Sequence, residues 1–206
     1  MTQSYTDEHL NTIYGLLFCD DIEMYRSSAK NTAESQWKEL FSPQSPDAAL
    51  QAILKNGGLD SRVRLLASHL LRERGIVDSS RHLYGVIAEV ALDEGLDVLA
   101  VYEDGTARYI NFSGKMIIWE AETSESAQLK KELFAAAQNI VSKIGPWDGD
   151  RLPSPVTGNV RLNFLVSDGL YFGEAPFEAL AADPMGGAVL NSAGEFMRFL
   201  IGTTTA

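Results

Sequence analysis

The hydrophobic positions between residues 83 and 121 fall into four short runs rich in β-branched and aromatic side chains. The runs cover residues 83–92, 96–103, 106–112 and 115–121, and each of the three breaks between them contains a glycine. Short apolar runs joined by glycine-containing turns are typical of neighbouring antiparallel strands. The pattern therefore predicts a four-stranded antiparallel meander.

Residues 1–75 show the spacing of helices instead. Apolar positions such as Leu10, Ile13 and Leu17 recur at the helical period, which predicts one helix from about Asp7 to Ser28. Capping and stop signals predict further helices over residues 32–41, from Pro46 to about residue 56, and from Asp60 to the residue before Gly75.

The chain after the meander predicts a helix over residues 124–144, a Pro/Gly-rich loop, a second hairpin around residues 167–169, and helical segments over 176–182 and 187–201. This order is typical of the α+β class, with an N-terminal helical bundle followed by a mainly antiparallel sheet and packed helices. The chain is expected either to form two subdomains, residues 1–75 and 82–206, or to fold as a single compact domain. The order of the later elements resembles that of profilin-like and roadblock-like modules; the resemblance includes no shared motif and implies no function.

The register of the meander decides which residues share a face. Two-residue turns at Asp104-Gly105 and Ser113-Gly114 would place Leu99 opposite Ile110, and Ile110 opposite Ile117. In that register both faces are mostly apolar, whereas a sheet with one face in water should alternate apolar and polar residues. Both faces are therefore expected to be covered. The chain's own helices are the favoured cover, and a second copy of the chain on one face is the alternative.

The same register gathers a polar group on one face of the sheet. It consists of Glu89, Tyr102, Tyr109 and Asn111. A carboxylate among phenols on an apolar surface would have a shifted pKa and would mark a ligand pocket, so these four residues are the candidate ligand-binding residues. The alternative is that Glu89 lies at a sheet edge in contact with water, while the tyrosines pack with bonded hydroxyls.

Composition and charge narrow the function. The chain has 206 residues and a formal net charge of −11, which disfavours binding to the phosphates of nucleic acid. The single cysteine, Cys19, excludes an intrachain disulfide, and no apolar run approaches the length of a membrane span. The N-terminal residues lack the order of a signal peptide. We therefore expect a protein of a bacterial-type cytoplasm that binds neither nucleic acid nor membrane.

Candidate chemistry is sparse. Asp20 and Glu23 are one helical turn apart, but no third acid or second acidic motif accompanies them, and the three histidines have no metal-ligand spacing. Gly186-Gly187 before a helix could hold an anion, yet no Lys or Ser/Thr follows as in a phosphate loop. The sequence predicts no catalytic residue, no metal site and no cofactor.

The favoured function is therefore that of a noncatalytic cytoplasmic binding protein acting through an apolar sheet face. Its partner would be another protein, a second copy of the chain in a homodimer, or a small ligand. The alternative is a small-molecule enzyme, hydrolase-like, whose site is assembled only by the fold. A flat apolar patch would favour the first hypothesis, and a concave pocket with several convergent polar groups would favour the second.

Overall fold

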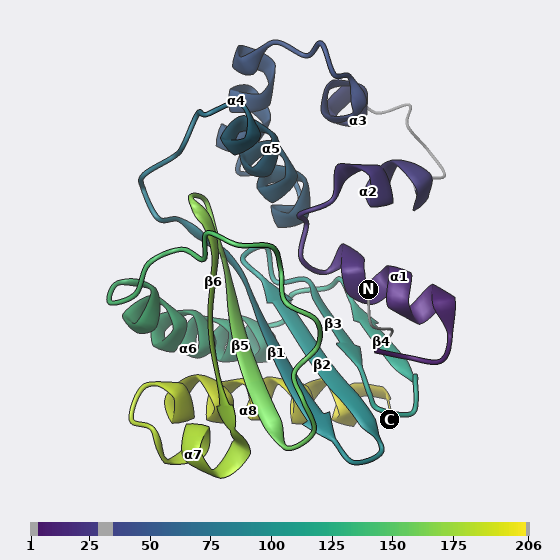
Figure 1. Cartoon of the computed structure of the whole chain (residues 1–206), viewed down its shortest axis with the longest axis vertical. Coiled ribbons are helices and arrows are strands. Elements are labelled where there is room, and N and C mark those ends of the chain that lie inside the picture. Colours follow the sequence, from purple (N-terminus) through teal and green to yellow (C-terminus); the bar gives the residue numbers. More distant parts are fainter. Residues whose placement is uncertain (1–3, 29–34, 205–206) are drawn as a thin grey trace.

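A computed structural model describes residues 4–28 and 35–204 of the chain. Within these residues it contains eight helices and one six-stranded antiparallel sheet, which confirms the predicted α+β class. Helices come first, and the sheet with its remaining helices follows (Figure 1).

Five helices precede the sheet: α1 (Glu8–Leu16), α2 (Ile22–Ser28), α3 (Ser35–Phe41), α4 (Asp47–Lys55) and α5 (Ser61–Glu73). The prediction of a single helix over residues 7–28 is wrong, because the helix ends after α1 and a second helix, α2, begins at Ile22. Cys19 has φ +55°, a left-handed conformation that no α-helix of L-residues accommodates. In Figure 1, α2 to α5 gather at one end of the sheet, while α1 lies against it.

The sheet has the strand order β4-β3-β2-β1-β5-β6. The strands are β1 (Leu83–Leu92), β2 (Gly95–Tyr102), β3 (Ala107–Ile110), β4 (Met116–Trp119), β5 (Asn159–Val166) and β6 (Gly169–Pro176). Helix α6 (Ser124–Val141) connects β4 to β5, and α7 (Phe177–Ala182) and α8 (Gly186–Thr204) follow β6. The second hairpin therefore extends the meander on the far side of β1.

The predicted register of β3 is wrong by one residue. The loop between β2 and β3 is closed by the Tyr102 N–H, which donates to Thr106 O at 2.9 Å, and Gly105 has φ +86°. This is a three-residue loop with a left-handed glycine, one residue longer than the assumed turn. Val98 rather than Leu99 consequently lies opposite Ile110. The turn between β3 and β4, with Gly114 at φ +82°, is also one residue longer than assumed. The two one-residue shifts cancel, so the side chains of β4 lie on the faces that the sequence predicts.

The chain's own helices cover both faces of the sheet, as the sequence favours. Leu133 of α6 and Phe196 of α8 pack with Leu99 and Phe164 on one face. The other face packs against α1, α4 and α5, in a cluster that contains residues from both 1–75 and 82–206. Nearly all residues of β1, β2, β3 and β5 are buried, as expected for a sheet covered on both faces. The division into two subdomains stays a prediction.

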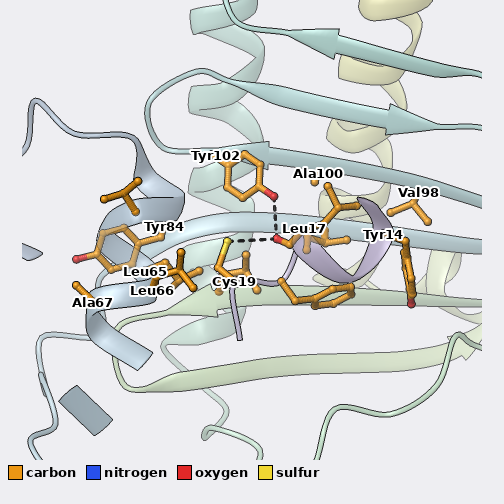
Figure 2. Packing of buried hydrophobic residues seen from close by; sticks show 14 of the residues in the cluster. Tyr14, Leu17, Cys19, Leu65, Leu66, Ala67, Tyr84, Val98, Ala100 and Tyr102 are labelled. Carbon is orange, nitrogen blue, oxygen red and sulfur yellow. Dashed lines mark hydrogen bonds between the residues drawn. The ribbon is translucent and has the colours of Figure 1, made fainter. Parts of the chain in front are cut away.

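Tyr102 ties the helical segment to the sheet. Its hydroxyl donates to the carbonyl oxygen of Leu17, just beyond α1, at 2.7 Å, and both residues are buried. Figure 2 shows this hydroxyl pointing at the Leu17 carbonyl, with Cys19 beside it. A buried carbonyl needs such a donor, since it has no access to water.

We predict that Tyr102→Phe lowers the free energy of unfolding by about 1–3 kcal/mol, because the buried Leu17 carbonyl loses its strong donor and keeps only the weak contact of the Cys19 thiol at 3.7 Å. Urea denaturation followed by circular dichroism measures the change. The denaturant slope should match that of the wild type. A loss of less than a few tenths of a kcal/mol would show that this hydrogen bond does not fasten α1 to the sheet.

Candidate functional site

The structure separates the four residues predicted to form one ligand site. Glu89 and Tyr102 share the face that α1 covers, but Tyr102 lies opposite Gly85, four residues along β1 from Glu89. Tyr109 lies on the other face, as a consequence of the corrected register. Asn111 belongs to a turn, where its side-chain oxygen accepts the N–H groups of Ser113 and Lys115. The predicted cluster is therefore wrong in its arrangement.

Glu89 is fully buried in the central strand, so it is not the edge residue of the alternative hypothesis. The hydroxyl of Tyr14 donates to one of its carboxylate oxygens, and Asn163 Nδ2 donates to the other at 2.7 Å. Burial raises the pKa of Glu89 above its ordinary value of 4.5, although these hydrogen bonds oppose the shift. We name Glu89, Tyr14, Asn163 and Arg161 the Glu89 cluster.

A row of charges crosses three strands at this cluster. Glu89, Arg161 and Glu174 lie directly opposite one another in β1, β5 and β6. Arg161 Nη2 lies 2.6 Å from Glu174 Oε2, and Arg161 Nη1 lies 3.8 Å from Glu89 Oε2. Arg161 Nη1 also donates to Pro153 O at 2.6 Å. The row thereby fastens the loop over residues 147–158 to the sheet.

A cleft of about 620 Å³ lies next to Tyr14 and is lined by five carboxylates. The chain's own groups engage four of the five: Asp20 with Arg151 at 2.7 Å, Asp21 with the Met24 N–H at 2.9 Å, Glu23 with Arg26 at 2.6 Å, and Glu73 with His69 at 3.4 Å. These four carboxylates therefore serve the fold as a helix cap and as members of ion pairs. Within residues 4–28 and 35–204, no group of three or more His, Cys, Asp or Glu could hold a metal ion.

The opposite face of the sheet carries a second, more apolar cavity of about 340 Å³, which we name the Tyr109 pocket. Strands β1, β2 and β3 form its floor, and α7 and α8 form its walls. Its lining consists of Ala88, Val90, Asp97, Leu99, Tyr109, Phe177, Ala181, Leu190, Asn191, Ala193, Gly194, Met197 and Arg198. An apolar cavity with few polar groups is the usual form of a small-molecule site.

The turn between α7 and α8 fixes the walls of the Tyr109 pocket. A Cβ on Gly187 would lie 2.5 Å from the carbonyl oxygen of Ala181, so only glycine allows this close approach. Asp183 Oδ1 accepts the N–H groups of Met185 at 2.9 Å and Gly186 at 2.6 Å. The N–H groups of Gly186, the first residue of α8, and of Met185 before it are thus bonded to the chain's own carboxylate, in the place where the sequence allowed for a bound anion.

Gly194 lies in the middle of α8 and lines the Tyr109 pocket. A Cβ built on it would meet no heavy atom within 4 Å. Glycine inside a helix costs about 0.5–1 kcal/mol relative to alanine, and here no close neighbour requires it. What glycine provides at this position is open space in the wall of the pocket.

The polar groups of the Tyr109 pocket are few. The Tyr109 hydroxyl donates to Asp97 Oδ2 at 3.0 Å, and the Phe112 N–H donates to Asp97 Oδ1 at 2.6 Å. Burial, together with the adjacent Asp97, raises the pKa of Tyr109 well above its ordinary value, so the phenol remains a neutral donor. Asn191 and Arg198 are exposed on α8.

A third cavity of about 400 Å³ lies between α4, α5 and the start of β1. His82 lines it, with Nε2 2.9 Å from Glu103 Oε1. Arg64 Nη1 lies 2.9 Å from the other oxygen of Glu103. The pKa of Glu103 lies below its ordinary value because of the adjacent His82 and Arg64, with burial acting in the opposite direction.

Comparison with known proteins does not assign a function. The sequence matches no protein-family model, and the search of curated proteins finds no match. In the part of the chain that the structure describes, no helix is both long enough and apolar enough to cross a membrane. The function is therefore argued from the geometry of the sites themselves.

We predict opposite pH dependences for the two acids beside Arg161. The raised pKa of Glu89 means that its contribution to stability is full below pH 4.5 and is lost as the pH rises through its folded-state pKa. Relative to Glu89→Gln, the wild type should therefore lose stability as the pH rises from 4.5 toward neutral. Urea denaturation across this range measures the difference, and a difference that stays constant with pH would contradict a raised pKa for Glu89.

Glu174→Gln is the matched control. Burial raises the pKa of Glu174, but hydrogen bonds from Asn159 and Arg161 outweigh burial and hold this pKa below its ordinary value of 4.5. Its contribution is present above pH 4.5 and is lost as the pH falls through its folded-state pKa. Relative to Glu174→Gln, the wild type should lose stability on acidification. A common direction for both variants would show that a general effect of pH, rather than the two local environments, governs the trend.

Proposed function

We propose that the protein is a noncatalytic binding protein that holds a small, largely apolar molecule in the Tyr109 pocket. The observation that carries the proposal is Gly194, which leaves open space in the wall of an apolar cavity at a cost in helix stability. Selection for stability alone favours alanine there, since open space accommodates its methyl group. A pocket that must admit a ligand favours glycine.

The chemistry of the lining supports binding. Val90, Leu99, Phe177, Leu190 and Met197 provide aliphatic, aromatic and thioether surface from four different elements. The titratable side chains are those of one aspartate, one tyrosine and one arginine. Apolar surface gives affinity by removing the ligand from water, and a few polar groups fix its orientation.

The test uses a neutral apolar fluorescent probe, N-phenyl-1-naphthylamine, whose emission rises when it leaves water. We predict that Gly194→Leu fills the pocket and weakens probe binding at least tenfold, equivalent to about 1.4 kcal/mol. Gly194→Ala should keep most of the binding and raise the free energy of unfolding by about 0.5–1 kcal/mol. Fluorescence titration and urea denaturation measure the two effects.

Glu195→Leu is the matched control, because it adds the same side chain at the neighbouring, exposed position of α8 outside the pocket. Probe binding should be the same as in the wild type. Equal binding to wild type and Gly194→Leu, or no binding to the wild type, would contradict the proposal.

A second candidate function is hydrolysis at the cavity around His82. A histidine held 2.9 Å from a carboxylate can serve as a general base toward water, and the His82–Glu103 pair lines a cavity. Hydrolysis of p-nitrophenyl esters, measured for the wild type and for His82→Gln, tests it. Turnover that the substitution abolishes supports this candidate, and turnover equal to the uncatalysed rate excludes it for these esters.

A further inference from the structure

We propose that the ligand of the Tyr109 pocket is a zwitterion with an apolar body, of the class of apolar α-amino acids. Its ammonium group would bind Asp97, and its carboxylate would bind Arg198. This inference rests on the proposed binding function and adds the chemical class of the ligand.

Asp97 provides the negative end of the pocket. Each of its carboxylate oxygens accepts one hydrogen bond from a neutral donor, from the Tyr109 hydroxyl and from the Phe112 N–H. Among the described residues, no Lys, Arg or His lies within ion-pair distance of it. A carboxylate has about four acceptor sites, so Asp97 retains capacity for an ammonium group.

Arg198 provides the positive end. It is exposed on α8 and lines the same pocket, and in the described part of the chain it has neither an ion pair nor a side-chain hydrogen bond. Its guanidinium carries five N–H donors in a planar fork that matches a carboxylate with two parallel hydrogen bonds. An anionic group is therefore its best complement.

The two charges come from facing layers. Asp97 belongs to β2 in the floor, Arg198 belongs to α8 in the wall, and they form no ion pair with each other although both line one cavity. Apolar residues such as Leu99 and Met197 share that lining. A neutral ligand would form an ion pair with neither Asp97 nor Arg198, and a singly charged ligand would form one with only one of them. An apolar amino acid pairs both charges and places its side chain against the apolar surface.

Two series of small probes test the inference by NMR titration of the full chain. The first is leucine with 3-methylbutylamine and 4-methylpentanoate, which lack the carboxylate and the ammonium group respectively. The second is phenylalanine with phenethylamine and 3-phenylpropanoate. In at least one series we expect the amino acid to bind at least tenfold more tightly than either singly charged analogue, equivalent to about 1.4 kcal/mol per lost pair.

Two variants test which residue binds each charged group of the ligand. Asp97→Asn should abolish the advantage of the amino acid over the carboxylate analogue, and Arg198→Gln should abolish its advantage over the amine. Glu195→Gln, on an exposed neighbouring residue outside the pocket, is the control and should change neither affinity. An advantage that both pocket variants retain would overturn the assignment of Asp97 and Arg198.

The outcomes also separate this inference from the proposed function. If the amine or the acid alone binds as tightly as the amino acid in both series, the proposal of a zwitterionic ligand is overturned. If no amino acid binds while N-phenyl-1-naphthylamine binds in a manner sensitive to Gly194→Leu, the zwitterion is wrong and the pocket remains a binding site. If neither kind of probe binds, both proposals are overturned.

Discussion

The burial of one carboxylate in the middle of the sheet constrains much of this fold. Glu89 lies in β1, the strand that pairs with β2 on one side and β5 on the other, and none of its side chain reaches water. A charge or a polar group in such a place is costly unless donors surround it. Tyr14 from α1 and Asn163 from β5 supply these donors, and Arg161 connects Glu89 to β6 and to the loop over residues 147–158. The first helix, the central strands and the crossing loop are thereby held in one arrangement.

The two faces of the sheet differ in how their polar groups and cavities are arranged. On the face of the Glu89 cluster, polar groups are paired and the packing joins the N-terminal helices to the strands. On the opposite face, α6 and α8 bury the sheet, but the short α7, the tight turn at Gly187 and the bare backbone at Gly194 leave a cavity. The face with the buried carboxylate holds the molecule together, and the face with the Tyr109 pocket is the one we propose to bind a ligand.

The sequence predicts the elements well because the signals for them are local. Glycine-containing breaks mark the turns of the meander, and Gly75, at φ +78°, ends α5 as expected. The predicted cluster of four residues depends on register, which a single extra residue in the loop at Asp104-Gly105 reverses for β3. Asp-Gly suits both a two-residue turn and a three-residue loop with a left-handed glycine, so the dipeptide alone does not decide between them. The sequence therefore predicts the wrong face for Tyr109.

Other parts of the site lie beyond local pattern. The partners of Glu89 come from residues about 75 positions away on either side in the sequence, so no spacing announces them. Asp97 carries no signal of a binding site in the sequence either, because acidic residues are common near turns. Gly194 does leave a local signal, since this glycine lies within a predicted helix whose apolar positions include Leu190, Ala193 and Met197.

The central claim is that a ligand occupies the space beside Gly194, and the most direct measurement is of nuclear Overhauser effects between bound N-phenyl-1-naphthylamine and methyl groups of the protein. The account predicts contacts from the probe to the methyl groups of Met197, Leu99 and Ala193, all in the lining of the Tyr109 pocket. Contacts instead to Ile118, which is exposed on the edge strand β4, or to Leu152 beside the acidic cleft, would contradict it.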